Sequence, residues 1–398
     1  MKVIRLPRNL QYPMSRNGSE GDVYMMHEGW DYVCSDGMVR QIKEVESREF
    51  SVRDMPSNWE GQKDFAPGAT LTILCPGGIG DLLCLRAVLA QMRQQYPGLL
   101  IHVIATPQDT YWLAPYIDKL SPYPVRLDAV ESFEFVASLE DIHRQSPHAE
   151  LYDAFADILH VDLPAETPQL EAPLILNQAD RDLAKWQVRN GSGRPKIGIQ
   201  VASAAHYRSY PNHLNALLAM ELTQEGHRRQ SDQMFDVYFF GTIFQSIRWR
   251  EDGELVDPPE HIHDICGRYQ TNAEMIALVD EMDVLIVPDS AIMHIGAYLE
   301  KPTLAFFSIT EATQRTGYYP TVAYIQGEAD CAPCQNIAMY PSCGERFCKA
   351  MLAISPYYAA DVATRMYEVG GVLEEGLEYD AERHGPLELA DTSGLTRQ

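Results

Sequence analysis

The sequence predicts an α/β protein built from two consecutive doubly wound domains with parallel sheets. From Leu71 onward, apolar runs of strand length alternate with stretches of helical periodicity, which is the pattern of βαβ units. The chain has 398 residues, more than one hydrophobic core usually organises. A passage rich in proline and acidic residues, 161–173, interrupts the alternation and is the best candidate for a domain boundary.

Four segments follow from these observations. We expect a β-rich N-terminal extension over residues 1–68 and a first parallel-sheet domain over 69–173. A second parallel-sheet domain is expected over 174–353, followed by a last helix and an acidic tail over 354–398.

The N-terminal extension contains turn-rich stretches between short runs that favour strands. Residues 30–33 and 38–42 are such runs, and a turn is predicted between them at 34–37. We expect a small hairpin element here. No residue in it indicates a chemistry.

The first domain opens with a strand, a glycine turn and a helix. An apolar run that begins at Leu71 ends at Pro76, and leucines at helical spacing follow the turn. The turn holds Gly77, Gly78 and Gly80, which permit positive φ and the close approach of another molecule. The glycine spacing matches neither the G-x-G-x-x-G dinucleotide motif nor a Walker phosphate loop.

Asp81 lies at the start of the helix that follows this turn. In an open α/β sheet, ligands bind beyond the carboxyl ends of the strands, so a carboxylate here is well placed for catalysis. Acidic residues also cap helices well, because amide hydrogens are exposed at a helix start. A helix cap and a catalytic carboxylate are therefore both open interpretations of Asp81.

The remaining elements alternate in the same way. In the first domain we expect a strand at 99–104, a helix at 110–120 and a strand at 124–127. In the second part of the chain the expected strands are 196–201, 235–240 and 283–287, and the expected helices are 178–190, 212–225, one after Gly241-Thr242, 271–282 and 356–368.

Asp289 and Ser290 follow one of the expected strands, and a helix begins at this point. Its exposed amide hydrogens, including that of Ala291, favour a phosphate, and His294 lies on its first turn. The simpler interpretations are that Asp289 or Ser290 is an ordinary helix cap and that His294 is a packed core residue.

The loop at residues 201–211 carries Ser203 and a single arginine, Arg208. In a chain this acidic, a cation beside the carboxyl end of a sheet is a candidate phosphate ligand. A solvated loop arginine is the alternative. Gly241 and Thr242, at the end of the next expected strand, complete the predicted binding residues of this domain.

These motifs, in this order, resemble those of glycosyltransferase family 9, the bacterial heptosyltransferases that use ADP-heptose. The first loop of the family reads G-x-G-D-x-L and appears here as Gly78-Ile-Gly-Asp-Leu-Leu83. The donor loop, a basic residue followed by x-aromatic-Pro, appears as Arg208-Ser-Tyr-Pro211. The motif D-[ST]-G-x-x-H appears as Asp289-Ser-Ala-Ile-Met-His294. The resemblance covers residues 70–370.

The resemblance implies a GT-B fold, in which two Rossmann-like domains face a cleft, and inverting sugar transfer without a catalytic metal. Asp81, in an acceptor domain, would be the general base that takes the proton of the acceptor hydroxyl. In a donor-binding domain, Arg208 and the amides of Ser290 and Ala291 would stabilise charge on the departing diphosphate. His294 would support this loop or touch the donor.

One residue and one short segment differ from the family pattern. Ala291 replaces the glycine of the D-[ST]-G motif. Residues 307–310 replace the usual G-P-T-[DE] turn at the base-binding end of the donor pocket. The sequence therefore supports sugar transfer more strongly than it supports heptose as the sugar or ADP as the nucleotide.

Four of the eight cysteines lie in one short segment, at Cys331, Cys334, Cys343 and Cys348. Thiolates at this spacing suit one tetrahedral metal ion. Some members of the resembled family that modify proteins carry a four-cysteine iron-binding finger. A structural zinc or iron ion and a set of reduced thiols in a loop are the two alternatives.

The composition restricts partners and location. The formal net charge is −24, which disfavours nucleic acid and anionic membranes as partners. It also argues against an anionic lipopolysaccharide acceptor, so we expect a protein, a neutral glycan or a small molecule in that role. No apolar run is long enough to span a bilayer and no signal-peptide core is found, so a cytoplasmic protein is expected.

Two other functions suit the same motifs. One is a nucleotide-sugar epimerase on the same fold, which would need no acceptor. The other is a non-catalytic sugar-nucleotide-binding or assembly protein, for which the N-terminal extension and the acidic tail would serve a partner. The oligomeric state stays open, with a homo-oligomer among the alternatives.

Overall fold

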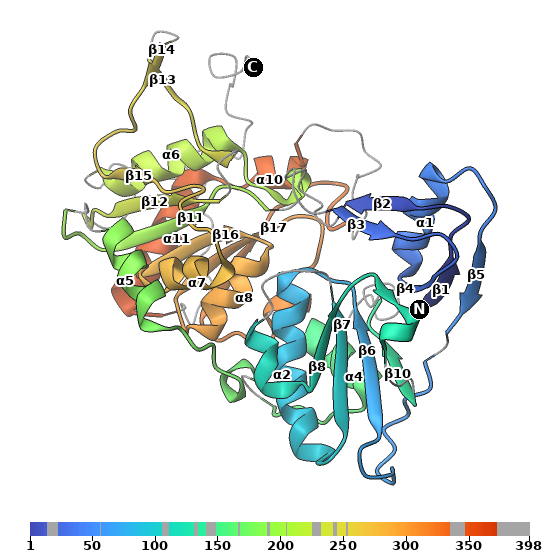
Figure 1. Ribbon diagram of the computed structural model, residues 1–398. Coiled ribbons are helices and arrows are strands. Elements are labelled where there is room, and N and C mark those ends of the chain that lie inside the picture. The colour runs from blue at the N-terminus through green and yellow to red at the C-terminus, as the bar shows by residue number, and fades with distance from the viewer. Residues whose placement is uncertain are drawn as a thin grey trace. The chain divides into compact units, whose positions relative to one another are not determined.

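The computed structural model describes residues 1–13, 23–55, 57–105, 111–130, 134–140, 149–165, 168–188, 192–203, 205–224, 232–241, 245–251, 254–334 and 347–371. The chain forms two compact units, Met1–Ala172 and Pro173–Gln398 (Figure 1). Each unit is described by itself below.

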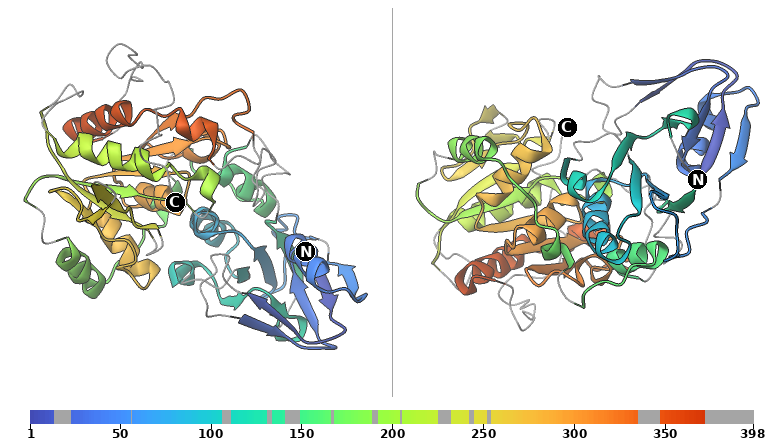
Figure 2. Two further views of the ribbon diagram at one scale, coloured as in Figure 1. Left: turned by 90° about the horizontal axis from the view of Figure 1, so that it is seen from above. Right: turned by 60° about the horizontal axis from the view of Figure 1, so that its bottom comes forward.

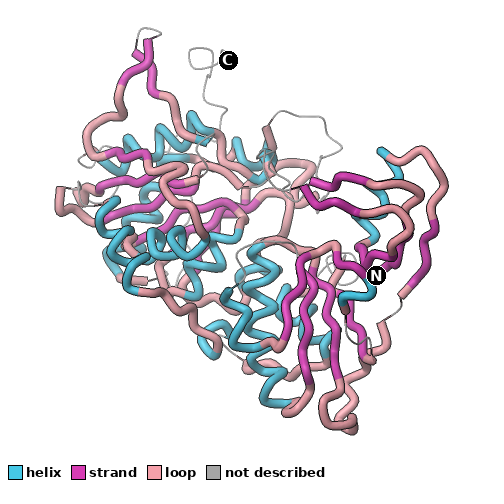
Figure 3. The backbone as a smooth tube through the Cα atoms, viewed as in Figure 1, coloured by secondary structure: helices cyan, strands magenta, loops and turns pink. Residues whose placement is uncertain are grey.

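The first unit contains a parallel sheet with the strand order β10-β6-β7-β8. The helix α2 (Ile79–Gln95) is buried around most of its circumference and packs against α4 (Leu151–Leu159), alongside these strands (Figure 3). The predicted strand, turn and helix at the start of this domain are confirmed. The strands are β6 (Thr70–Cys75), β7 (Leu100–Ala105), β8 (Lys119–Pro122) and β10 (Phe135–Ser138).

A second, antiparallel sheet of this unit has the order β5-β1-β4-β9. Three of its strands come from the N-terminal extension, but β9 follows β8 in the chain. Ile4 and Val33 of the extension share one apolar core with Leu74 and Ile104 of the parallel sheet. The strands are β1 (Lys2–Arg5), β4 (Asp31–Cys34), β5 (Ser51–Asp54) and β9 (Val125–Arg126), and β2 (Leu10–Pro13) and β3 (Val23–Met26) form a separate hairpin.

The strand expected at residues 38–42 is wrong, because this segment is part of the helix α1 (Asp36–Val45). The hydroxyl of Ser35 caps the helix by accepting the amide hydrogen of Met38 at 3.0 Å. Met38, Val39 and Ile42 are buried on one side of it. These positions have helical spacing, and burial against the rest of the unit decides between the two structures.

The helix expected at residues 110–120 is also wrong for the described residues. A 3₁₀ helix, Tyr111–Tyr116, is followed by the strand β8. Pro115 lies inside the short helix, and its missing amide hydrogen disfavours a longer α-helix.

The second unit is built on a parallel sheet with the order β15-β12-β11-β16-β17-β18. Several of its strands are buried along their whole length, as expected when helices cover both faces of a parallel sheet. The predicted strands of this part are confirmed with small shifts at their ends. The strands are β11 (Lys196–Gln200), β12 (Asp236–Phe240), β15 (Ile262–Asp264), β16 (Val284–Pro288), β17 (Thr303–Phe307) and β18 (Val322–Gln326).

Helices cover both faces of this sheet (Figures 1 and 2). On one face α6 packs against α11, the last helix predicted from the sequence, and both contribute to the core of this unit. On the other face α5, α7 and α8 pack in series. The bounds are α5 (Gln178–Gln187), α6 (Asn212–Thr223), α7 (Asn272–Asp280), α8 (Ala291–Tyr298), α9 (Thr313–Thr316), α10 (Lys349–Leu352) and α11 (Pro356–Val369).

One predicted helix of this unit is not tested, because residues 242–244 after Gly241 lie outside the described residues. The next strands are β13 (Trp249–Glu251) and β14 (Glu254–Val256), which pair as a hairpin. The acidic tail after residue 371 also lies outside the described residues. Across the described part of the chain, every helix is too short or too polar to cross a membrane.

Candidate functional site

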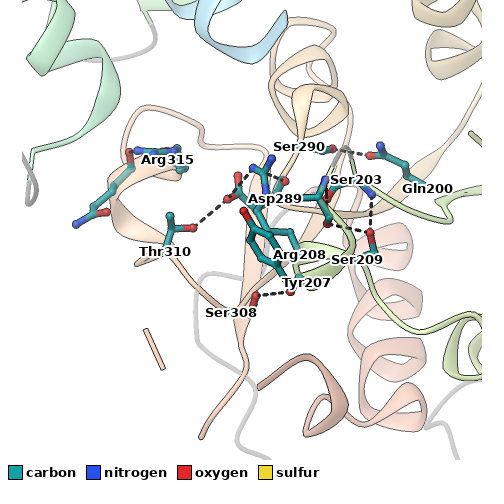
Figure 4. Close-up of polar contacts among 12 residues, drawn as sticks. Gln200, Ser203, Tyr207, Arg208, Ser209, Asp289, Ser290, Ser308, Thr310 and Arg315 are labelled. Atoms are coloured by element: carbon teal, nitrogen blue, oxygen red, sulfur yellow. Dashed lines mark hydrogen bonds and ion pairs between the residues drawn. The ribbon is translucent and has the colours of Figure 1, made fainter. Parts of the chain in front are cut away.

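Polar side chains gather at the carboxyl ends of three neighbouring strands of the second unit. The loop after β11 carries Ser203 and Arg208, Asp289 and Ser290 follow β16, and Thr310 follows β17 (Figure 4). These strands are adjacent in the sheet, in the order β11-β16-β17. The structure therefore brings together two of the loops that the sequence indicated and adds a third.

Asp289 is the centre of this group, and its side chain is buried with 4% of the residue exposed. Its carboxylate oxygen Oδ2 accepts a hydrogen bond from the Thr310 hydroxyl at 2.9 Å. Nη1 of Arg208 lies 3.5 Å from the same oxygen and donates to the backbone carbonyl oxygen of Asp289 at 3.2 Å. Asp289 thus ties the loop after β11 to the loop after β17.

Four neighbouring groups decide the charge of this carboxylate. Burial raises the pKa of Asp289, but the positive charges of Arg208 and Arg315, the hydrogen bond from Thr310 and the charge of His294 together lower that pKa below its ordinary value. Asp289 is therefore an anion at neutral pH, although it is buried.

Ser290 stands at the start of α8 but does not act as a side-chain cap. Its hydroxyl donates a hydrogen bond to the side-chain oxygen of Gln200, the last residue of β11. The ordinary cap interpretation is therefore wrong for Ser290, and it does not describe Asp289, whose carboxylate holds Thr310 and Arg208. The amide groups at the start of α8, including that of Ala291, remain oriented toward this edge of the sheet.

The loop after β11 is held by its own serines. The amide of Ser203 donates to the Ser209 hydroxyl at 3.0 Å, and the Ser203 hydroxyl donates to the carbonyl oxygen of Ala205 at 2.8 Å. The hydroxyl of Ser308 reaches the carbonyl oxygen of Tyr207 at 3.5 Å. These contacts place Arg208 rather than leaving it on a mobile solvated loop, and its side chain is 27% exposed.

His294 is buried within α8, with 4% of the residue exposed. Its Nδ1 forms a hydrogen bond of 2.5 Å with the Tyr319 hydroxyl, and the two rings pack edge to face. His294 also lies close enough to Asp289 to lower the pKa of that carboxyl. His294 is therefore a packed core residue, and its electrostatic effect falls on the Asp289 carboxylate.

Gly241 is buried at the end of β12, and its backbone oxygen accepts the amide hydrogen of Gly267 at 2.8 Å. A Cβ atom here would lie 2.5 Å from the side-chain oxygen of Gln245 and 3.2 Å from Val201. A side chain at residue 241 would therefore displace the end of the Gln245 side chain and press on Val201. Thr242, the other predicted residue of this turn, lies outside the described residues.

Thr310 and Arg315 belong to this group of side chains, but the sequence motifs did not indicate either of them as a site residue. Thr310 is 3% exposed and Arg315, on α9, is 7% exposed. A signal for Thr310 was present, because Ser308 and Thr310 follow an apolar strand closely. No local pattern marks Arg315, whose relation to Asp289 depends on the adjacency of β16 and β17.

In the first unit, Asp81 lies on the first turn of α2 and is partly exposed. Its Oδ2 accepts the amide hydrogen of Gly78 at 2.7 Å, as a helix-capping carboxylate does. None of Gly77, Gly78 and Gly80 has positive φ, so the turn does not use the left-handed conformation that these glycines permit. Gly77 is instead needed because the side chain of Asp81 occupies the space where a Cβ would lie.

A second carboxylate lies at the same edge of the first sheet. The amide of Leu139 donates to the carbonyl oxygen of Leu74 at 2.9 Å, which continues the pairing of β10 with β6. Glu140 follows, is buried, and accepts the amide hydrogen of Gly37 at 2.9 Å. The N-terminal extension thus contacts the strand end beside the glycine turn.

The cysteine segment follows β18. Cys331 and Cys334 are exposed, Cys348 is partly buried, and Cys343 lies outside the described residues. Among the side chains that the structure describes, no group of three or more histidines, cysteines and acidic residues is arranged to hold a metal ion. The described cysteines therefore do not fit a metal site on their own.

The sequence matches a model of a known protein family. The family model for glycosyltransferase family 9 (heptosyltransferase) matches residues 140–340, a span that includes Arg208 and Asp289 but not Asp81. No curated protein matches the sequence.

Solved structures share the fold at low sequence identity. The crystal structure of the family 9 glycosyltransferase from Veillonella parvula DSM 2008 is 14% identical, with a TM-score of 0.53, and the match covers 77% of this chain and 99% of that one. The E. coli ADP-heptose LPS heptosyltransferase II is 14% identical, with a TM-score of 0.49 and coverage of 75% of this chain and 99% of that one. The iron-containing dodecameric glycosyltransferase TibC of enterotoxigenic E. coli H10407 is 12% identical, with a TM-score of 0.46 and coverage of 84% and 80%. The predicted GT-B fold class is confirmed.

Proposed function

The chain belongs to glycosyltransferase family 9 and is a glycosyltransferase, and from this premise we propose that it transfers heptose from ADP-heptose to a hydroxyl acceptor. The transfer proceeds with inversion and without a catalytic metal. The observation that carries this proposal is the edge of the second sheet, where Arg208 lies beside the uncapped start of α8.

This edge suits the diphosphate of a sugar nucleotide. A helix start presents amide hydrogens and a partial positive charge to an anion, and the Ser290 hydroxyl is engaged with Gln200 instead of those amides. Arg208 adds a full positive charge and five donors in a planar arrangement. Fixed positive potential of this kind stabilises the charge that grows on the leaving diphosphate, which is the role a metal ion would otherwise have.

Asp81 is the proposed general base. It takes the proton of the acceptor hydroxyl while the oxygen attacks the anomeric carbon, and the bond from that carbon to the diphosphate oxygen breaks on the opposite face. The hydrogen bond from the Gly78 amide orients the carboxylate. The capping contact and the catalytic role are therefore compatible in one side chain.

The acceptor is proposed to be a protein, a neutral glycan or a small molecule. The formal net charge of −24 supports this choice, because an anionic lipopolysaccharide core would be repelled. Incorporation of labelled sugar into purified inner-core lipopolysaccharide at a rate equal to that with a protein or neutral acceptor would contradict it.

A structural zinc or iron ion at the cysteine segment is proposed on the sequence spacing of Cys331, Cys334, Cys343 and Cys348. Four sulfur ligands would leave no position for substrate, so this ion would hold the loop and take no part in the transfer. We derive no catalytic step from it.

A thermal-shift panel of ADP-, UDP- and GDP-sugars tests the donor class, because a ligand that binds only the folded state raises the melting temperature. We expect ADP-sugars to give the largest shift. A change of sugar without any acceptor would instead indicate an epimerase. Binding without hydrolysis, transfer or epimerisation would indicate a non-catalytic protein.

A further inference from the structure

Two arginines, Arg208 and Arg315, place positive charge near the buried carboxylate of Asp289. Figure 4 shows Arg208 on one side of it and Thr310 on the other, with Arg315 on the side of Thr310. Thr310 donates at 2.9 Å, whereas the closest approach of the Arg208 guanidinium to the carboxylate is 3.5 Å. The contact with Thr310 is a full hydrogen bond, and the contact with Arg208 is long.

The two arginines differ in exposure. The side chain of Arg208 is 27% exposed, while Arg315 is almost fully buried and its Nη1 donates to the carbonyl oxygen of Gln314 at 2.9 Å. The Arg208 side chain is therefore partly open to solvent at the edge of the sheet, whereas the Arg315 side chain is enclosed and bonded to the backbone. Both guanidinium charges act on Asp289.

An anionic donor creates a conflict at this site. The diphosphate of the donor attracts Arg208 away from Asp289. If Arg208 were the only cation near Asp289, its departure would leave a buried negative charge uncompensated, which is strongly unfavourable in free energy. An uncompensated Asp289 would also repel the diphosphate. A second cation that stays with Asp289 removes both penalties.

We propose that Arg315 is a positioning residue which, with Thr310, keeps the Asp289 carboxylate compensated so that Arg208 is able to leave it and bind the diphosphate of the donor. This inference rests on the proposed function and deepens it, because it assigns Arg315 a part in donor binding without contact to the donor. Among the described residues, other titratable groups that interact electrostatically with Asp289 are His294, itself bonded to Tyr319, and the Tyr207 hydroxyl.

The test measures the affinity for ADP by calorimetry in the full chain, at about pH 8 and about pH 5.5. At the higher pH we expect Arg315→Gln to bind ADP at least about tenfold more weakly than wild type. Removing Arg315 takes away one of the charges that lower the pKa of Asp289 against the effect of burial, so the pKa should rise and the loss of affinity should be smaller at the lower pH. The ratio of variant to wild-type affinity cancels the titration of ADP.

Two companion variants separate charge compensation from damage to the loop. Asp289→Asn added to Arg315→Gln should restore ADP affinity to within about threefold of wild type, because the charge that needed compensation is gone. Arg315→Lys should retain most of the affinity. The matched control is Arg181→Gln, which removes an arginine paired with Asp280 elsewhere in this unit and should leave ADP affinity unchanged.

The inference is overturned if Arg315→Gln binds ADP like wild type, or if its loss is equal at both pH values and not relieved by Asp289→Asn. If Arg315→Gln does not fold, Thr310→Val replaces it in the test. Thr310→Val should lose less than tenfold in ADP affinity, and this loss should shrink at the lower pH. A loss of ADP affinity that is the same at both pH values overturns the inference. If wild type binds no nucleoside diphosphate at all, the proposed function itself fails, which is a separate outcome.

Discussion

A Cβ atom on Gly77 would lie 2.4 Å from Oδ2 of Asp81, because the aspartate side chain folds back over the glycine turn. The same oxygen accepts the amide hydrogen of Gly78 at 2.7 Å. The absence of a side chain at residue 77 therefore determines where the carboxylate of Asp81 lies.

Gly77→Ala should displace this carboxylate. We expect a loss of about 1–3 kcal/mol in the free energy of unfolding, because the new methyl group overlaps a side chain that is held by a hydrogen bond. Sugar transfer should fall with it. The matched control is Gly78→Ala, where the nearest atom to the new Cβ is 3.9 Å away. Urea unfolding and transfer assays measure both, and equal effects of the two substitutions would contradict the argument.

Asp81→Asn should abolish the proposed proton transfer and leave the fold intact. The asparagine oxygen is still able to accept the Gly78 amide hydrogen, but the side chain no longer acts as a base. Loss of a general base lowers the transfer rate by about 10²–10⁴-fold. Thermal shifts with the donor should not change, and the exposed Asp64→Asn serves as the control. Transfer by Asp81→Asn at the wild-type rate would remove Asp81 from the mechanism.

Arg208→Gln should weaken donor binding and lower the transfer rate. A positive group that stabilises a leaving diphosphate contributes about 10²–10³-fold to the rate. Arg208→Lys should recover only part of this, because an ammonium group lacks the planar array of donors. Steady-state kinetics with the donor varied provide the measurement, with Arg181→Gln as control. Normal kinetics of Arg208→Gln would show that this arginine does not hold the donor.

The stability contributed by Asp289 should depend on pH. Its pKa in the folded protein is below the ordinary value of 3.8, so its contribution is complete above that value and is lost as pH falls through the lower folded pKa. At neutral pH, wild type should therefore exceed Asp289→Asn in unfolding free energy by about 1–3 kcal/mol. This difference should shrink below pH 3.8. Urea titrations at a series of pH values test it, and a difference that grows toward acid would contradict the assignment.

Protein purified without chelator should contain about one zinc or iron ion per chain if the cysteine segment is a metal site. Metal analysis by mass spectrometry measures this directly. Replacing Cys331 and Cys334 together by serine should remove the metal, while replacing the buried Cys266 by serine should not. If wild-type protein contains no metal and is fully active in transfer, the proposal of a structural metal ion is wrong.

Local sequence determined most of the elements in both units. The apolar run of β6, the glycine turn and the helical spacing of α2 are all contained in about two dozen adjacent residues. The start of α7 is equally local, because Thr271 accepts the amide hydrogen of Glu274. Two predictions failed where local signals were weak: α1 carries a short apolar run that suits either structure, and Pro115 interrupts the segment before β8.

The sequence by itself determined the parallel α/β architecture and the positions of Asp81, Arg208 and Asp289 at strand ends, since periodicity and turn residues act between near neighbours. Only the tertiary structure decided which of these strand ends meet. Ser290 reaches Gln200 because β16 lies beside β11, and Thr310 reaches Asp289 because β17 lies on its other side. Strand order is set by the packing of the whole sheet, so the buried charge of Asp289 acquires its partners only when distant segments fold together.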